Sequence, residues 1–85
     1  MALNEEFEAA VASSKQLSQK PGNDILLKLY ALYKQGTEGD VTADPPANAF
    51  DFVAKAKYQA WAEQKGLSVE EAKQNYIKLV NELKG

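Results

Sequence analysis

The chain has 85 residues, a length that allows one domain with a modest core and no separate catalytic module. Charged residues make up 26% of it and the net charge is −2, the balance of an ordinary folded domain rather than of a disordered segment. The chain has no Cys and no His, which excludes disulfides and thiolate metal sites and removes the commonest general base. All ten basic residues are Lys and the pI is about 5.0, which argues against nucleic-acid binding. We therefore expect no metal, no cofactor and no nucleic-acid partner.

The first two helical patterns occupy the N-terminal half. Apolar residues recur at spacings of three and four from Leu3 to Leu17, which predicts an amphipathic helix. We expect Asn4 to be its N-cap and Pro21-Gly22 to end it. A second helix is expected to begin near Asn23-Asp24, and its wide apolar face predicts neighbours on more than one side.

A long connection is predicted over residues 36–50. Gly36, Gly39, Pro45 and Pro46 all fall in this range, and none of them is favoured inside a helix. A loop of about fifteen residues is uncommon in a compact domain and is often functional.

Two further helices are predicted in the C-terminal half. Asp51 is the expected N-cap of the third helix, which runs to Lys65 and stops at Gly66. The fourth helix has the clearest start signal, a capping box over residues 68–71. One apolar stripe then follows it to the end of the chain: Ala72, Tyr76, Val80 and Leu83. The patterns together predict one four-helix, all-α domain over residues 1–85.

The location of the protein is predicted from two features of the sequence. The most apolar stretch, residues 25–33, is interrupted by Lys28 and falls well short of the roughly 20 residues that a membrane span needs. Glu5, Glu6 and Glu8 stand where a signal peptide would carry positive charge. We expect a cytoplasmic protein.

Tyrosines and lysines recur on the predicted helices in positions that suit one site. Tyr30 and Lys34 are four residues apart on one face of the second helix, with Tyr33 beside them, and Lys57 lies on the third. Taken singly, each tyrosine is explained as a residue at the edge of the core and each lysine as part of a solvent-exposed helix face. Together they would make a pocket of rings, phenol hydroxyls and ammonium groups, which suits a nucleotide carrying phosphate.

Two motifs in these helices resemble those of a known family. Residues 29–40, LYALYKQGTEGD, closely resemble the Y-x-x-Y-K-Q-A-T-x-G-D signature of the acyl-CoA-binding proteins. Residues 51–61, DFVAKAKYQAW, are similar to that family's D-F-x-x-K-A-K-W-x-A-W stretch. The fourth helix is similar too, and the first matches through Phe7, Ala10, Leu17 and Lys20-Pro21. The resemblance covers almost the whole chain.

The resemblance implies both a fold and a site. The fold is an up-down-down-up four-helix bundle with the ligand in a bowl that opens on the surface. The resemblance implies that Tyr30, Lys34 and Lys57 hold the 3′-phosphate and adenosine end of coenzyme A, and that Tyr33 packs against adenine. It also implies that Tyr76 closes the site from the fourth helix and that Lys15 on the first helix contacts the ligand. The acyl chain and pantetheine are implied to lie near Leu26, Leu27 and Val53.

The chain departs from the family pattern at several places. Val53 stands where the family commonly has a lysine or another polar residue, and Tyr58 replaces a tryptophan. Ser14 takes an apolar position of the first helix, which predicts a weaker contact between the first and fourth helices. The loop over residues 44–50 is one residue longer than the common form and lacks its Arg-Pro-Gly pattern. We expect the rim beside the acyl chain to differ most from the family.

The leading hypothesis is a non-enzymatic carrier of medium- to long-chain acyl-CoA esters, monomeric, with transient contacts to acyl-CoA-using enzymes or membranes. One alternative is a helical protein-interaction module without a CoA ligand, in which the same helices present a groove to a partner. An enzyme such as a thioesterase or isomerase is disfavoured because His and Cys are absent. The chain's two adjacent carboxylate pairs, Glu5/Glu6 and Glu70/Glu71, do not converge on one point either, because neighbouring residues of a helix point about 100° apart.

Overall fold

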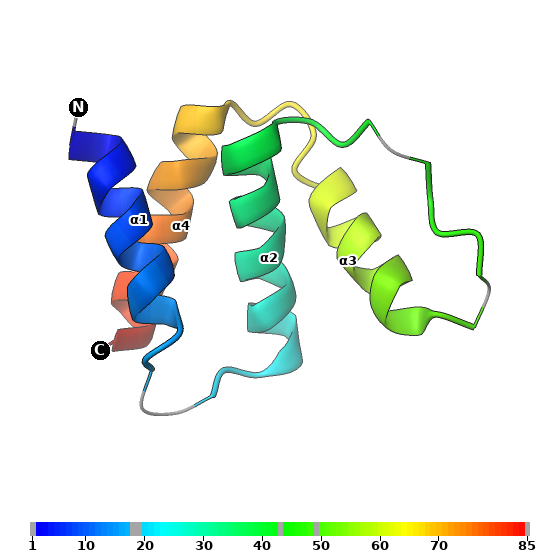
Figure 1. Cartoon of the computed structure of the whole chain (residues 1–85), viewed down its shortest axis with the longest axis horizontal. Coiled ribbons are helices and arrows are strands. Elements are labelled where there is room, and N and C mark those ends of the chain that lie inside the picture. Colours follow the sequence, from blue (N-terminus) through cyan, green and yellow to red (C-terminus); the bar gives the residue numbers. More distant parts are fainter. Residues whose placement is uncertain (1, 18–19, 43, 49, 85) are drawn as a thin grey trace.

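The structure, a computed structural model, describes residues 2–17, 20–42, 44–48 and 50–84, which form four helices and no strand (Figure 1). The helices are α1 (Ala2–Ser14), α2 (Asn23–Glu38), α3 (Phe52–Ala62) and α4 (Val69–Lys84). In Figure 1, α1 and α4 run downwards whereas α2 and α3 run upwards. The predicted all-α, up-down-down-up bundle is therefore confirmed.

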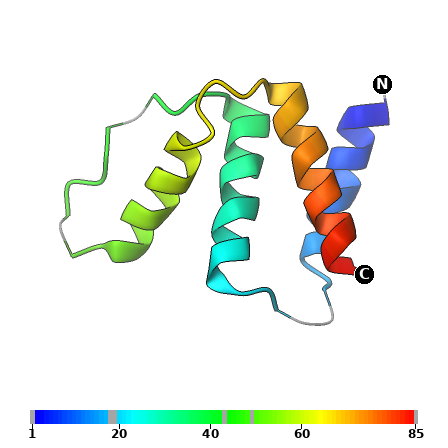
Figure 2. The same ribbon diagram turned by 180° about the vertical axis from the view of Figure 1, so that it is seen from behind.

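The helices form a flat arrangement with α2 in the middle. The principal extents are 38 × 29 × 15 Å. Close backbone contacts join α2 with α4, α1 with α4, and α2 with α3. Among the helices, α3 therefore packs closely against α2 alone. Seen from behind, α4 lies in front of α1 at one end of the molecule and α3 lies at the other (Figure 2). Because no such backbone contact joins α1 and α2, these helices meet through side chains and leave space for a pocket between them.

The hydrophobic core lies between α1, α2 and α4. It contains the stripes that the helical periodicity predicted, completed by two leucines of α2: Phe7, Ala10, Leu29, Leu32, Tyr76 and Val80. Burying each large side chain of this set contributes about 1.5–3 kcal/mol relative to leaving it exposed. The core therefore fixes α1, α2 and α4 against one another, while α3 is attached at the side by Trp61.

The ends of α1 differ from the prediction. The helix begins at Ala2, so Asn4 lies within its first turn, and its Oδ1 accepts a hydrogen bond from Lys73 instead of capping the helix. The helix ends at Ser14, well before Pro21, and a turn follows it. The Ser14 hydroxyl donates to the Val11 carbonyl at 2.7 Å, a local bond that competes with helix continuation.

The prediction that the loop begins at Gly36 was also wrong. Helix α2 continues to Glu38, and Gly36 is buried within it. The cap is Gly39, whose φ of 79° and ψ of −154° fall in a region that side chains rarely allow. Tertiary packing against α1 and α4 overrides the low helix propensity of Gly36, and the connection shortens to residues 39–51.

The starts of α3 and α4 follow the predicted capping. Oδ1 of Asp51 accepts from the backbone N–H of Ala54 at 3.0 Å. Oγ of Ser68 accepts from the N–H of Glu71 at 3.1 Å and also donates to its carboxylate. Helix α3 ends at Ala62, three residues earlier than predicted, and the turn that follows contains Gly66 with a φ of 94°.

Candidate functional site

Two lysine–aromatic contacts cross between α2 and α3. Nζ of Lys57 on α3 lies 5.4 Å from the ring centroid of Tyr30 on α2. Nζ of Lys34 on α2 lies 4.9 Å from the centroid of Trp61 on α3. Tyr30 and Lys34 are four residues apart on their helix, as are Lys57 and Trp61, so each helix presents one ring and one cation on a single face. This crossed pair concentrates two ammonium groups beside aromatic surface, where each is attracted to the face of a ring.

The Lys34 ammonium also forms an ion pair with a residue one helical turn further along. Its Nζ donates to the carboxylate of Glu38. That hydrogen bond raises the pKa of Lys34 above its ordinary value, with further support from the negative charge of Glu38. Lys34 is therefore fully charged at neutral pH, with Glu38 as its ion-pair partner.

Three aromatic rings link α1, α2 and α4. Phe7 stacks on Tyr33, with ring centroids 5.9 Å apart and an interplanar angle of 22°, and meets Tyr76 edge-on at 5.2 Å. Tyr33 is 40% exposed, whereas Tyr76 is only 4% exposed and belongs to the core. The structure thus presents the Tyr33 ring to solvent with the other two rings packed around it. Ser14, predicted to weaken this region, accepts a hydrogen bond from the Tyr76 hydroxyl.

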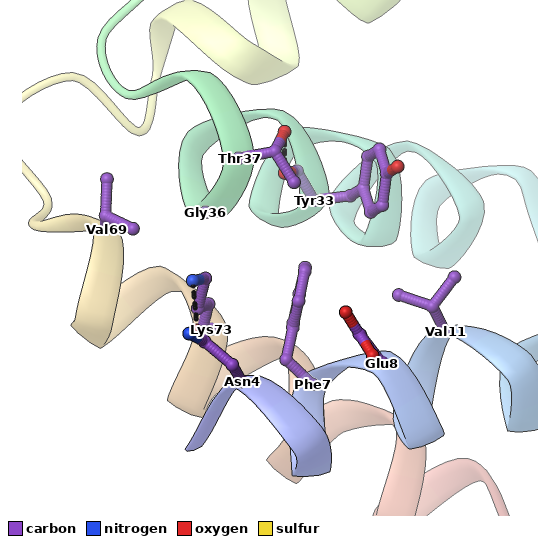
Figure 3. A pocket seen from close by; sticks show the side chains of 9 residues that line it. All are labelled: Asn4, Phe7, Glu8, Val11, Tyr33, Gly36, Thr37, Val69 and Lys73. Carbon is purple, nitrogen blue, oxygen red and sulfur yellow. Dashed lines mark hydrogen bonds between the residues drawn. The ribbon is translucent and has the colours of Figure 1, made fainter. Parts of the chain in front are cut away.

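A pocket of about 540 Å³ opens between α1, α2 and the start of α4 (Figure 3). Its volume lies within the range of small-molecule sites, about 300–1,000 Å³. In Figure 3 the Phe7 and Tyr33 side chains point toward each other from α1 and α2, and Lys73 lies at one side with Asn4. Residues from three helices line the pocket, among them Phe7, Val11, Tyr33, Gly36, Thr37 and Lys73.

The remaining residues predicted for the site are more scattered. Lys15 lies in the exposed turn that follows α1. Leu26 and Leu27 are half-buried near the start of α2, and Leu27 lines a separate hollow of about 460 Å³ between α2 and α3, together with Ala31. Val53 is 65% exposed at the start of α3. The head-group residues of α2 and α3 are therefore brought together, while the acyl-side residues are not gathered into one cavity.

Sequence reasoning missed three pocket residues and the role of Trp61. Lys73 was not singled out, Asn4 was interpreted as an N-cap and Gly36 as part of a loop. Lys73 directly follows a buried position of α4, which was a usable signal, because a residue beside the apolar stripe lies at the edge of the core. Trp61 was noted only as part of a motif, although its spacing of four from Lys57 places both on one face.

Two absences hold for the part of the chain that the structure describes. Its Asp and Glu side chains include no group of three or more that could hold a metal ion. Within the same residues, no helix combines the length and the apolar character needed to cross a membrane.

The fold and the crossed pair define a small helical domain with two lysine–aromatic contacts on one face and a pocket lined by aromatic rings. A family model described as acyl CoA binding protein matches residues 4–80, and the chain belongs to this family. It is 53% identical over 77 residues to acyl-CoA-binding protein homolog 1 of Caenorhabditis elegans, covering 91% of this chain and 88% of that protein. It is 49% identical over 77 residues to the acyl-CoA-binding protein of Dictyostelium discoideum, with 91% and 90% covered.

Two further matches extend this comparison. The crystal structure of Oryza sativa acyl-CoA-binding protein 2 aligns with a TM-score of 0.90 at 41% identity, covering 95% of this chain and 89% of that one. Enoyl-CoA delta isomerase 2 of Rattus norvegicus is 49% identical over 82 residues, but the match covers 96% of this chain and only 21% of that protein. The similarity to the isomerase is therefore confined to a small part of the enzyme.

Proposed function

We propose that this chain is a single acyl-CoA-binding domain over residues 1–85, which binds medium- to long-chain acyl-CoA esters and carries them without catalysing a reaction. The observation that carries the proposal is the crossed pair of Lys34 with Trp61 and Lys57 with Tyr30, in a chain of this family. It supplies two ammonium groups and two rings at one place, as a phosphorylated nucleotide head requires.

The head group of coenzyme A is anionic, whereas the protein has a net charge of −2. A site for it must therefore concentrate lysines locally. We assign the phosphates to Lys34 and Lys57, with Tyr30 between them. Tyr33 supplies an exposed ring for the base, and Tyr76 supports that ring from the core. The contact through Lys15 remains a prediction.

The acyl tail is assigned to the α2 and α3 residues Leu26, Leu27 and Val53. Each methylene that leaves water contributes up to about 0.8 kcal/mol, so affinity is expected to rise with chain length. A valine at position 53 in place of a polar residue adds apolar surface to this side.

Titration calorimetry with palmitoyl-CoA, octanoyl-CoA, coenzyme A and free palmitate tests the proposal. We expect the affinity to decrease in that order for the three CoA compounds, and palmitate to bind weakly because it lacks the head group. Absence of binding by every CoA compound would overturn the carrier function and favour an interaction module.

The non-catalytic part of the proposal rests on composition, because the chain has neither His nor Cys. Incubating palmitoyl-CoA with the protein and measuring free thiol tests it: no release above the buffer rate is expected, and steady release would indicate a thioesterase. A cytoplasmic location, a monomeric state and transient contacts with acyl-CoA-using enzymes or membranes remain predictions.

A further inference from the structure

Lys73 brings a positive charge from α4 into the pocket between α1, α2 and α4. Its Nζ donates to Oδ1 of Asn4 at 2.6 Å and lies 5.7 Å from the ring centroid of Phe7. Among the described residues, no carboxylate oxygen lies within 4.0 Å of this nitrogen. An ammonium group has three N–H donors, and Asn4 uses one of them. Lys73 is thus held in place with donors left for a further acceptor.

The room for this lysine depends on Gly36 of α2. A Cβ at position 36 would lie 3.2 Å from Cγ of Lys73 and 3.6 Å from Cζ of Phe7. The first of these distances is tighter than ordinary van der Waals contact, so Lys73 would have to shift by a few tenths of an ångström to admit a larger residue. The signature that residues 29–40 resemble has Ala where this chain has Gly36. Gly36 and Lys73 therefore act as a matched pair in this protein.

The same pocket offers groups of complementary chemistry around a flat surface. The exposed ring of Tyr33 is held by stacking on Phe7, so it can receive another planar ring. Lys73 stands at one side of Phe7 and the Glu8 carboxylate at the other (Figure 3). A nitrogen heterocycle with ring acceptors and an exocyclic amine matches this pattern, because the ammonium donates to a ring nitrogen and the carboxylate accepts from the amine.

We infer that Lys73 is a ligand-contacting residue, which donates a hydrogen bond to the purine base of the ligand while that base lies on Tyr33, and that Gly36 makes this contact possible. The inference rests on the proposed function, since the base is the adenine of coenzyme A. Tyr33 lies in the same turn of α2 as Lys34, so the phosphates attached to a base on Tyr33 need to span only a short distance to reach the crossed pair.

Calorimetry on a matched pair of variants tests the contact. Lys73→Met removes the charge inside the pocket, and Lys78→Met removes one further along α4, outside this pocket. With adenosine 3′,5′-bisphosphate and with coenzyme A, Lys73→Met should bind about tenfold more weakly than the wild type, as loss of a hydrogen bond from a charged donor implies. Lys78→Met should stay within about twofold, because exposed charges contribute little.

An acyl phosphopantetheine, which has the tail and one phosphate but no adenosine, separates this inference from a general effect of charge. Its affinity should be the same for wild type and Lys73→Met. Equal losses for Lys73→Met and Lys78→Met, in a protein that does bind coenzyme A, would overturn the role of Lys73 and leave the carrier function standing. Failure of the wild type to bind any of these ligands would overturn both.

The role of Gly36 is tested by Gly36→Ala, alone and combined with Lys73→Met. Alone, Gly36→Ala should weaken binding of adenosine 3′,5′-bisphosphate. This loss is expected even though alanine is more favourable than glycine inside a helix by about 1 kcal/mol. In the Lys73→Met background it should cause no further loss; an equal loss in both backgrounds would contradict the pairing. Nitrogen NMR of the lysine side chains gives a direct readout, because the Lys73 Nζ signal should shift on ligand addition, and an unmoved signal at saturation would overturn the inference.

Discussion

The hydroxyl of Tyr76 on α4 donates a hydrogen bond to the hydroxyl of Ser14, the last residue of α1, with 3.1 Å between the oxygens. Ser14 donates in turn to the carbonyl of Val11 at 2.7 Å, so its oxygen is oriented to accept. Tyr76 is almost fully buried and touches the rings of Phe7 and Tyr33. This bond therefore fixes the ring that supports Tyr33, and it joins α1 to α4 at the position where the sequence predicted a weaker contact.

The bond predicts how two substitutions combine. Ser14→Val leaves the buried Tyr76 donor without its partner and should lower the free energy of unfolding by about 1–3 kcal/mol. Tyr76→Phe removes the donor itself and should cost less, about 0.5–1.5 kcal/mol. Urea unfolding of both variants and of the double variant measures the coupling, with Ser13→Val as a control for placing valine in this turn of the helix. Strict additivity would mean that the hydroxyls do not stabilise each other.

The fold was predicted well wherever local patterns and core packing agree. The four helices, the caps at Asp51 and Ser68 and the buried stripe of α4 all follow from spacing and capping chemistry. The errors fall where tertiary contacts override a local signal. Gly36 stays in α2 because it packs against Lys73 and Phe7, and Asn4 binds Lys73, more than sixty residues away in the chain. No local pattern encodes contacts of that range.

Lys57→Ala tests the assignment of the phosphate end. Removing the ammonium group that lies over Tyr30 should weaken palmitoyl-CoA and coenzyme A by the same factor, about tenfold, because both carry the same head group. Lys55→Ala is the matched control, since two residues along a helix point in different directions. Calorimetry with both ligands gives the comparison. A loss confined to palmitoyl-CoA would place Lys57 on the tail instead.

Asp40 predicts a loss of stability in acid. Its Oδ1 accepts hydrogen bonds from the Gly66 N–H at 2.9 Å and from Nε2 of Gln35 at 2.7 Å, and these bonds lower its pKa below the ordinary 3.8. Between the lower pKa of Asp40 in the folded protein and its ordinary pKa in the unfolded chain, the unfolded chain therefore binds more protons than the folded protein. The stabilisation is complete above about pH 3.8 and is lost as the pH falls through the folded value.

Urea unfolding at a series of pH values measures this contribution. The wild type should lose stability below about pH 3.8, and Asp40→Asn should lose less over the same interval because the amide takes up no proton. Asp44→Asn, in the exposed loop, is the control and should follow the wild type. A wild-type and an Asp40→Asn curve of the same shape would show that another carboxylate governs the acid sensitivity.

The site was predictable to the extent that it lies on single helix faces. Tyr30 with Lys34, and Lys57 four residues before Trp61, follow from helical spacing together with the family motifs. How the two faces cross does not follow, because the angle and register of α3 against α2 depend on packing. Glu38 became visible as the partner of Lys34 only when α2 proved to extend past Gly36.

Trp61 joins the fold to the site, and two substitutions separate its roles. Its Nε1–H donates to the Gly39 carbonyl at 2.8 Å, and its ring lies under the Lys34 ammonium. Trp61→Phe and Trp61→Leu both remove the donor, so each should lose about 1–3 kcal/mol of unfolding free energy. Only Trp61→Phe keeps an aromatic ring beneath Lys34.

If that ring orients the lysine for phosphate, Trp61→Leu should bind coenzyme A about twofold to fivefold more weakly than Trp61→Phe. This difference corresponds to the low end of the free energy that a cation–π contact contributes. Calorimetry well below the unfolding temperature of both variants makes the comparison, and equal affinities would limit Trp61 to holding α3 against the Gly39 turn.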